Sequence, residues 1–336
     1  MFRAIGAIVV VAVAAVCLIV AWPQVFGLER ASVVAQAVSL RGLASAVALV
    51  LVVVCTLIAL LSAQARRFTA SLAVVLLAFV AINVAVLSIR GFGNAGFQSA
   101  TDDDVTVLTW NTLGDLPSPE VIADLIVDTG AEVVVLPETT AQHGIDIQTA
   151  LATLGQDFQT QTVAYDEISK ARSTTLLVSS VLGAYSVDSS IETTAVLPTI
   201  VATPVDGTGP TIIGVHSVAP IPGEMANWNA DLAWLADACG TPNVIMAGDF
   251  NSTLDHYTGL GSSPDTVLGD CVDAASATDN AAVGTWPTAI PALLGAPIDR
   301  VLATENWRVT GMRVILSHDQ YGSDHRPVLA QLTPAG

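Results

Sequence analysis

The sequence predicts three membrane-spanning helices followed by a single α/β domain. Three long apolar segments fall within the first 90 residues, at 5–22, 43–61 and 70–89. From residue 105 onward, short runs rich in β-branched residues alternate with stretches of helical period, and this alternation is typical of sheets covered by helices. A polar segment, GFGNAGFQSATDDD, separates the two parts. We therefore divide the chain into a membrane anchor, a flexible linker and a folded domain, at 1–90, 91–103 and 104–336.

Each apolar segment is long enough to cross a bilayer. About 20 helical residues, with a rise of about 1.5 Å each, span a hydrocarbon core about 30 Å thick. The first segment taken alone is similar to a cleaved signal peptide. Two further segments follow it closely, and no clear cleavage site of small residues lies behind it. These features favour an uncleaved anchor that crosses the membrane three times.

The arginines of the anchor predict its orientation. Arg66 and Arg67 form a basic pair between the second and third apolar segments, and Arg3 precedes the first. Short loops rich in Lys and Arg remain in the cytoplasm, so these three residues predict a cytoplasmic N-terminus. Three arginines on the other side count against that assignment: Arg30, Arg41 and Arg90. With three spans, we expect residues 91–336 to lie outside the cytoplasm.

The charge of the domain argues against a nucleic-acid partner. Of the 30 acidic residues, 29 follow residue 100, together with only six basic residues. A surface of this sign repels a polyanion, and a sequence-general grip on DNA or RNA needs a basic track. No such track occurs in the sequence, so we do not expect nucleic acid as a partner.

Two cysteines lie in the domain, and the sequence leaves their pairing open. Cys17 and Cys55 fall within apolar segments, whereas Cys239 and Cys271 flank the GDFN motif. An oxidising compartment permits a disulfide between the latter two, and a cytoplasmic location would keep both thiols reduced.

The domain is predicted to consist of strands and helices separated by turn residues. Helices are predicted where apolar residues recur at helical spacing, at 118–130, with Pro119 in its first turn and Gly130 at its end, and at 223–240. Strands are predicted in the β-branched runs, at 105–110, 132–137, 174–180, 199–205, 211–217, 243–250, 298–304, 307–316 and 326–332.

Polar residues interrupt this pattern where predicted strands end or begin. The set is Asn111, Glu138, His216, Asp249, Asn251, Asp299, Asp324 and His325. Each has an ordinary structural explanation, such as a turn-forming amide or a buried histidine with its hydrogen bonds satisfied. Side chains at strand ends of one sheet meet at a common rim, where a site can form. The whole set therefore predicts an active site.

The chemistry of these residues indicates phosphoryl transfer to water. Glu138 and Asp324 are hard oxygen ligands of the kind that Mg²⁺ or Mn²⁺ prefers. Asp299 is suited to orient His325 and to stabilise its charged form. A second histidine and two amides supply hydrogen-bond donors for the oxygens of a phosphate.

Six motifs occur along the chain in one order: LTWNTLG, VLPETT, GVHSVAP, GDFNSTLD, IDRVLAT and GSDHRPVLAQL. Together they resemble the endonuclease/exonuclease/phosphatase superfamily, the metal-dependent phosphohydrolases related to DNase I. The resemblance covers residues 104–333, and GDFN together with SDHRP is its most specific part. It implies a four-layered α/β sandwich with a divalent metal, usually Mg²⁺, in its cleft.

The resemblance also implies the metal and phosphate contacts. Glu138 resembles the main metal ligand, Asn111 a polar residue near that metal, and Asp324 a metal-associated acid. His216 is similar to a histidine that contacts phosphate.

The resemblance implies that the other four residues act on the attacking water and in the transition state. Asp249 resembles the acid that orients the attacking water, with Asn251 its partner in the transition state. Asp299 and His325 resemble an acid–histidine dyad, within which the roles of base and phosphate contact stay open.

Three functions are compatible with the sequence. The first is a membrane-tethered phosphohydrolase acting on a phosphorylated envelope lipid. A three-span anchor before such a domain resembles the bacterial branch linked to teicoplanin and vancomycin resistance, which implies undecaprenyl pyrophosphate as the substrate. The second is an extracytoplasmic Mg²⁺-dependent endonuclease or phosphodiesterase. The third is a non-catalytic binding module with the same fold.

The nuclease alternative has the weakest support. Many nuclease members carry an aromatic and a basic phosphate contact in the middle of the domain, and Tyr165, Lys170 and Arg172 lie in that region without aligning to them. The expected partners are thus the lipid bilayer and a small or lipid-linked phosphate. The sequence does not predict the oligomeric state.

Overall fold

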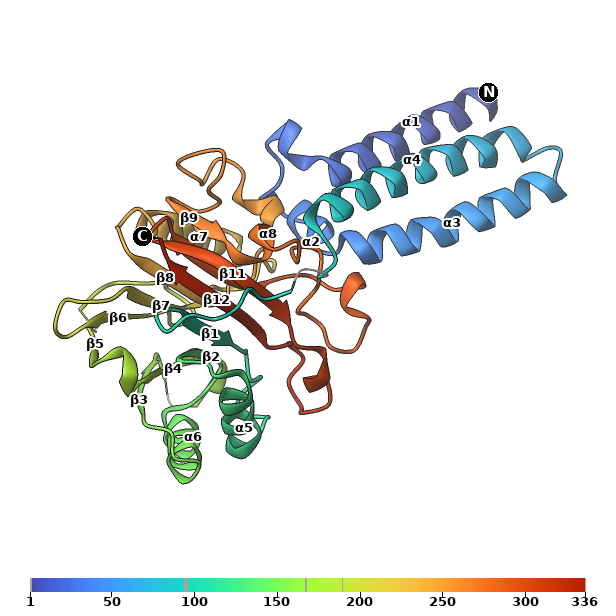
Figure 1. The fold of residues 1–336 in the computed structure, drawn as a ribbon. Coiled ribbons are helices and arrows are strands. Elements are labelled where there is room, and N and C mark those ends of the chain that lie inside the picture. Colours follow the sequence, from blue (N-terminus) through green and yellow to red (C-terminus); the bar gives the residue numbers. More distant parts are fainter. Residues whose placement is uncertain (1, 94–95, 167, 189, 336) are drawn as a thin grey trace.

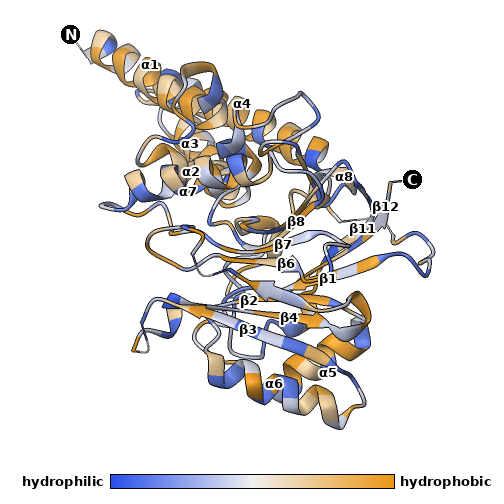
Figure 2. Cartoon of the chain, turned by 90° about the vertical axis from the view of Figure 1, so that its left-hand side faces the viewer, coloured by the Kyte–Doolittle hydropathy of each residue, from blue (hydrophilic) through white to orange (hydrophobic). Residues whose placement is uncertain are grey.

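A computed structural model describes the chain except for residues 1, 94–95, 167, 189 and 336. A rod of three long helices projects from a larger part that contains two β-sheets (Figure 1). The rod consists of α1 (Phe2–Ala21), α3 (Arg41–Leu61) and α4 (Arg66–Arg90). Within the described residues, these three helices are long and apolar enough to cross a membrane. Figure 2 shows the largely apolar character of the rod.

The chain between α1 and α3 is folded onto the domain. It forms a 3-10 turn, η1 (Pro23–Phe26), and a short helix, α2 (Val34–Ser39). Ala35 of α2 is fully buried within the same apolar cluster as Trp228 of the domain. From the sequence we placed this segment in the anchor, and its contacts with the domain were not predicted.

The first sheet has six strands in the order β11-β12-β1-β2-β4-β3. β1 and β2 are parallel, and the other neighbours are antiparallel. The strands are β1 (Val105–Thr109), β2 (Val133–Pro137), β3 (Phe158–Ala164), β4 (Ser173–Ser179), β11 (Trp307–Val314) and β12 (Val328–Pro334).

The second sheet also has six strands, in the order β5-β6-β7-β8-β10-β9. Its only parallel pair among the described strands is β7 with β8. The strands are β5 (Tyr185–Val187), β6 (Ile200–Pro204), β7 (Thr211–His216), β8 (Val244–Asp249), β9 (Cys271–Asp273) and β10 (Asp299–Thr304).

The two sheets pack face to face, with helices on their outer faces (Figure 2). The inner faces share one apolar cluster that includes Val135 of β2 and Ala247 of β8. Outside the first sheet lie α5 (Pro119–Thr129) and α6 (Ala141–Thr153), and outside the second lies α7 (Met225–Ala238). A short helix, α8 (Ala274–Ala277), follows β9. The expected four-layered α/β sandwich is confirmed.

The predicted helices begin and end near their sequence signals. In α5 the Ser118 side chain accepts a hydrogen bond from the Val121 amide, and Gly130 ends the helix in the left-handed conformation. The helix α6, which contains a glycine, was not predicted from the sequence. A side chain at Gly144 would meet the methyl groups of Thr175 and Thr160 at 2.8 and 3.0 Å, so the glycine lets α6 lie close to the sheet.

The linker at 91–103 was expected to be flexible, but its described residues contact the domain. The Gly93 amide donates to the Asp279 carbonyl at 2.9 Å, and the Gln98 amide donates to the Thr310 carbonyl at 2.8 Å. The described part of the linker is therefore bonded to the domain at these two residues.

Cys239 and Cys271 form a disulfide with a Cα–Cα distance of 5.7 Å. Both residues are fully buried, and the distance lies within the usual range for such bonds. The disulfide joins the end of α7 to the start of β9 and closes the chain around the GDFN motif.

Candidate active site

The register of the second sheet brings three of the predicted residues together. His216 at the end of β7 pairs with Asp249 at the end of β8, and Asp249 pairs with Asp299 at the start of β10. Gly248 permits this arrangement because its φ is +146° and a Cβ atom there would collide with the carbonyl of Val215. The glycine of GDFN thus allows β7 and β8 to approach at the site.

The first sheet supplies Asn111 after β1 and Glu138 after β2. The Asn111 amide donates from Nδ2 to Glu138 Oε1 and to Asp249 Oδ2, both at 3.1 Å. One buried amide therefore joins the two sheets at their rim. Glu138 has a φ of +58° and Asn251 of +45°; such left-handed backbone in non-glycine residues is strained and concentrates at functional sites.

Asp249 and Asn251 form the turn that an ordinary reading of GDFN predicts, and they also lie in the site. The Asn251 amide N–H donates to Asp249 Oδ1 at 2.9 Å, and its side chain donates to Asp249 Oδ2 at 3.1 Å and to the Ser217 carbonyl at 2.9 Å. Trp228 of α7 donates its indole N–H to the Asn251 carbonyl at 3.1 Å. The turn therefore fixes both side chains in place.

His325 and Asp299 form the predicted pair. His325 Nδ1 lies 2.8 Å from Asp299 Oδ2, and both side chains are buried. Burial alone would lower the pKa of His325, but Asp299, Asp249 and Asp324 together raise it to about 10. In the metal-free site these carboxylates favour the charged imidazole, whose Nε2 lies 3.9 Å from Asp249 Oδ2. This charge state suits a proton donor or a phosphate contact.

His216 has the opposite electrostatic environment. Its burial, with a smaller effect from His325, lowers the pKa of His216 to about 3. Its Nδ1 has no hydrogen-bond partner among the described residues, and its Nε2 lies 4.0 Å from Glu138 Oε1. A buried polar atom without a partner costs about 1–3 kcal/mol. A neutral histidine with an unpartnered ring nitrogen is suited to bind a ligand through that nitrogen.

Two carboxylates of the site, Asp249 and Glu138, have raised pKa values. Burial, and then the neighbouring charge of Asp299, raises the pKa of Asp249 to about 7. Burial also raises the pKa of Glu138, against the lowering effect of its hydrogen bond from Asn111. Carboxylates brought together out of water in this way are typical of a site that receives a cation.

The side chains fit a divalent cation. Ligand atoms of Asp249, Asp299 and His325 lie within 4.8 Å of one another, but two of these residues already share the 2.8 Å hydrogen bond. Glu138 and Asp324 are the better candidates, since the buried Asp324 Oδ1 has no hydrogen-bond partner among the described residues. Hard oxygen ligands of this kind suit Mg²⁺ or Mn²⁺.

The structure adds supporting residues that the sequence did not reveal. Trp286 donates its indole N–H to Asp324 Oδ2 at 2.8 Å, and the Thr285 hydroxyl accepts from the Asp299 amide at 3.0 Å. Ser323 accepts from the His325 amide at 3.0 Å. These residues lie in loops, where the sequence has no strand or helix period from which a supporting role could be predicted.

The two basic residues considered as phosphate contacts are paired with acids. Lys170 Nζ lies 3.1 Å from Asp115 Oδ2, and Arg172 lies 3.0 Å from Asp166 Oδ2. Tyr165 lies under the Arg172 guanidinium at 5.9 Å and donates its hydroxyl to the Thr194 carbonyl. All three lie beside the site without entering its hydrogen-bond network.

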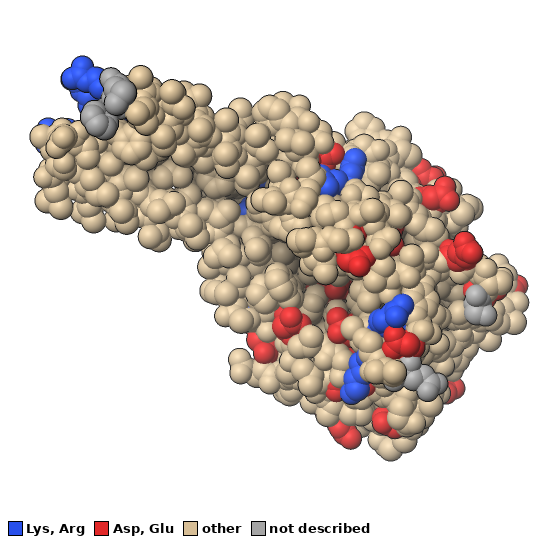
Figure 3. All heavy atoms as spheres, turned by 180° about the vertical axis from the view of Figure 1, so that it is seen from behind, with Lys and Arg blue, Asp and Glu red and all other residues tan. Residues whose placement is uncertain are grey.

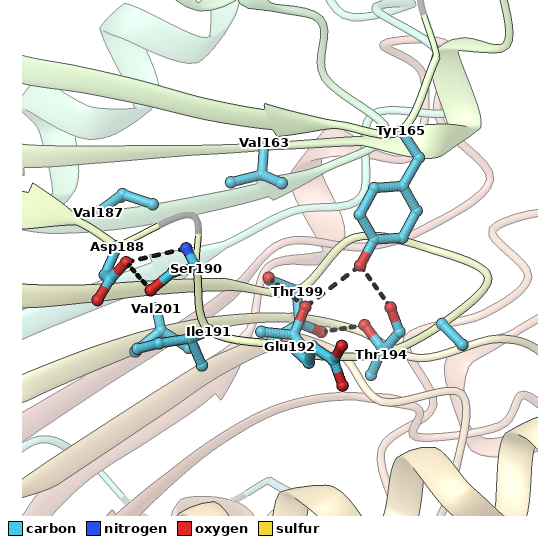
Figure 4. A pocket seen from close by; sticks show the side chains of 12 residues that line it. Val163, Tyr165, Val187, Asp188, Ser190, Ile191, Glu192, Thr194, Thr199 and Val201 are labelled. Atoms are coloured by element: carbon cyan, nitrogen blue, oxygen red, sulfur yellow. Dashed lines mark hydrogen bonds between the residues drawn. The ribbon is translucent and has the colours of Figure 1, made fainter.

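A cavity of about 380 Å³ opens between the sheets next to the site. Figure 4 shows Tyr165 reaching toward Thr194 across it, with Val163, Val187 and Val201 among its walls. Thr199 connects it to the site, because its hydroxyl accepts from the His216 amide at 3.1 Å. Its charged lining residues among those described are acidic, namely Asp188 and Glu192.

Comparisons with known proteins agree with this geometry. The model of the Endonuclease/Exonuclease/phosphatase family matches residues 108–325. The fold is similar to that of an endonuclease/exonuclease/phosphatase from Beutenbergia cavernae, with a TM-score of 0.50 and 19% identity over 70% of this chain and 72% of that one. It is also similar to humanized D. rerio TDP2, with a TM-score of 0.52 and 14% identity over 69% of this chain and 100% of that one.

No curated protein matches the sequence. At the identities found, the solved structures show the fold alone, whereas the family model covers most of the chain, including the eight residues of the site. The chain therefore belongs to the Endonuclease/Exonuclease/phosphatase family, a family of hydrolases that typically depend on a divalent metal.

Proposed function

We propose that the protein is a membrane-anchored, divalent-metal-dependent phosphohydrolase with its active site outside the cytoplasm. Its substrate is a phosphate ester or pyrophosphate of an envelope lipid, with undecaprenyl pyrophosphate as the first candidate. One observation carries the proposal. A site suited to phosphate lies in a domain that is hydrogen-bonded directly to the ends of two of the three apolar helices, α3 and α4.

The charge states of the site support a division of labour in the reaction. Asp249, with a pKa of about 7, orients water and accepts its proton as the new O–P bond forms. The His325 imidazolium donates a proton to the departing oxygen as the old P–O bond breaks, and Asp299 holds that ring in place. His216 donates a hydrogen bond to a phosphate oxygen as charge develops. Asn251, whose side-chain N–H groups bind Asp249 and the Ser217 carbonyl, holds Asp249 in place.

A divalent cation would be held by Glu138 and Asp324, with Asn111 orienting Glu138. When bound, it would supply positive charge that stabilises the phosphate oxygens in the transition state. The same charge would oppose protonation of His325, so the metal-loaded site has a lower pKa for this histidine than the metal-free site.

The anchor arginines support an extracytoplasmic domain. Arg41 and Arg90 counted against this orientation, but both are bonded to Asp255 inside the protein. Arg30 donates to the carbonyls of His256 and Thr258 at 2.6 and 3.0 Å. Since these three side chains bind the protein itself, they are weak topological signals. Arg3 lies at the start of α1, and Arg66 and Arg67 lie at the start of α4, at the tip of the rod far from the domain, where Figure 3 shows basic atoms. The disulfide also fits an oxidising compartment.

A lipid phosphate fits the surface better than a nucleic acid does. Figure 3 shows acidic atoms spread over the domain, the basic residues beside the site are paired with acids, and the cavity next to His216 carries acidic groups. A polyanion would be repelled at each of these places.

A substrate panel with Mg²⁺ tests the proposal. Phosphate released from undecaprenyl pyrophosphate or from another phosphorylated lipid would support it. Nicking of plasmid DNA with no lipid turnover would establish the nuclease alternative. Absence of turnover on every substrate, with the metal bound, would establish a binding module.

A further inference from the structure

The anchor and the domain meet at one buried carboxylate. Asp255 lies in η4 (Leu254–Tyr257), four residues after Asn251, and is 1% exposed. Its Oδ1 accepts from Arg41 Nη2 at 2.6 Å and from Arg90 Nη2 at 2.8 Å. Its Oδ2 accepts from Arg41 Nε at 3.0 Å and from Arg90 Nη1 at 2.8 Å. Gln24 adds a further donor at 3.0 Å.

These arginines stand at the domain end of the rod. Arg41 is the first residue of α3, and Arg90 is the last residue of α4. Burial alone would raise the pKa of Asp255, but Arg90 and Arg41 hold it well below its ordinary value. Two arginines that each bind one buried carboxylate through two hydrogen bonds fix the distance and the direction between the helix ends and η4. We call this cluster of Arg41, Asp255 and Arg90 the joint.

A second contact leads from the rod to the site. The Ala281 amide donates to the Arg90 carbonyl at 2.9 Å. Further along the same loop, the backbone of Leu293 packs on Gly42 of α3 so closely that no side chain would fit there. Between these two contacts lies Trp286, whose indole holds Asp324. One loop therefore touches both the membrane-side helix ends and the site.

Three loops that carry Asn111, Trp286 and Asp324 are hydrogen-bonded to one another and bear exposed apolar side chains. The Ser323 hydroxyl donates to the Asn111 carbonyl at 2.6 Å, and the Thr288 amide donates to the Asp324 carbonyl at 2.9 Å. The exposed side chains of these loops, which we call the mouth residues, are Leu113 (38%), Leu116 (55%), Leu293 (47%), Leu316 (54%) and Tyr321 (44%).

One of the mouth residues lies where the rod leaves the domain, because the backbone of Leu293 packs on Gly42 near the start of α3. Figure 1 shows the loop after α8 and the loop between β11 and β12 on the side of the domain from which the rod projects. That side faces the bilayer surface when the rod spans a membrane. Exposed apolar side chains rimmed by polar loops mark interaction sites.

We propose that the mouth residues dock on the bilayer surface and that the joint holds them there. A lipid phosphate then reaches the site from the interface while its chain stays in the bilayer. The inference rests on the proposed function in one respect, that the three helices span a membrane. It adds the orientation of the site and identifies Asp255 as a positioning residue.

Fluorescence quenching by lipids tests this orientation in the full-length protein. Cys17 and Cys55 are replaced by Ala, and a single cysteine is introduced by Leu316→Cys or, as control, by Val181→Cys. Val181 is 84% exposed in η3 (Ser180–Leu182), which follows the end of β4 that lies opposite the site. Each protein is labelled with a fluorophore and reconstituted into vesicles that contain nitroxide-headgroup lipids.

We expect the label at 316 to lose most of its emission and the label at 181 to keep it. Equal quenching at both positions, or none at 316 in protein that resists alkaline extraction from the vesicles, would overturn the docking. Extraction of the protein by alkali would contradict the membrane anchor itself.

The joint is tested by adding Asp255→Asn to the Leu316→Cys protein. Loss of quenching at 316, with the disulfide intact, is expected, and unchanged quenching would overturn the role of Asp255. If the variant does not fold, Arg90→Lys replaces it, because a lysine keeps the charge but not the bidentate contact. Quenching is measured without turnover. The docking can therefore fail while the proposed activity is found, and the activity can fail while the docking is found.

Discussion

Replacing Asp255 by Asn should destabilise the protein far more than loss of an exposed ion pair. The substitution keeps the shape of the side chain but leaves the Arg41 and Arg90 guanidiniums, 4% and 16% exposed, without a counter-charge. Removing one partner from a buried pair costs about 3–5 kcal/mol. For a domain of about 230 residues, at about 2 °C per kcal/mol, that corresponds to a fall in Tm of about 6–10 °C.

The matched control is Asp166→Asn. Asp166 pairs with Arg172 at 3.0 Å, but the side chains are 31% and 41% exposed, so the expected loss is below about 1 kcal/mol. Thermal unfolding of the two full-length variants in the same detergent, followed by tryptophan fluorescence, gives the comparison. Equal shifts in Tm would refute the reasoning that the joint is a dry, fully formed ion cluster.

The joint also predicts a pH dependence of stability. The pKa of Asp255 in the folded protein lies well below its ordinary value of 3.8. Its contribution to the free energy of unfolding is therefore present above that ordinary value and is lost as the pH falls through the folded-state pKa. Between pH 6 and pH 3 the Asp255→Asn protein should lose less stability than the wild type, and a parallel loss would contradict this assignment.

Three further outcomes are expected. His325→Ala and Asp299→Ala should each lower kcat by several orders of magnitude, with the double variant little worse, because groups that act as one unit are not additive; multiplicative losses would separate the pair. Replacing Cys239 and Cys271 by Ala should cost about 4 kcal/mol of stability, from the 32-residue separation that the bond closes; alkylation of both thiols in intact membranes without reductant would contradict the bond. Gly248→Ala should abolish turnover, since its methyl group collides with the carbonyl of Val215; full activity would show that β7 can move away.

The site could be predicted because its residues follow strands. Asn111, Glu138, His216 and Asp249 each end a run of β-branched residues, and parallel strands bring such ends to one rim. The layers followed from the same strands and from two helices of clear period. By contrast, α6 was not predicted, because its glycine and few apolar residues break the helical pattern.

The contacts between anchor and domain could not be predicted. Asp255 is separated from Arg41 by 214 positions in the sequence and from Arg90 by 165. A lone aspartate after GDFN looks like a solvated turn residue, and the arginines look like topological signals at the ends of apolar segments. Only the folded structure shows that these charges cancel one another in a buried cluster, just as only it shows the indole of Trp286 on Asp324.

Turnover of undecaprenyl pyrophosphate by full-length protein in vesicles is the most direct test of the proposed phosphohydrolase activity. Glu138 and Glu132 stand at opposite ends of β2 (Val133–Pro137), directly after and directly before it, so Glu132→Gln is the matched control for Glu138→Gln. We expect phosphate release by the wild type and by Glu132→Gln in Mg²⁺, and none by Glu138→Gln or by any of the proteins in EDTA. Full turnover by Glu138→Gln in EDTA would contradict the metal-dependent phosphohydrolase proposed here.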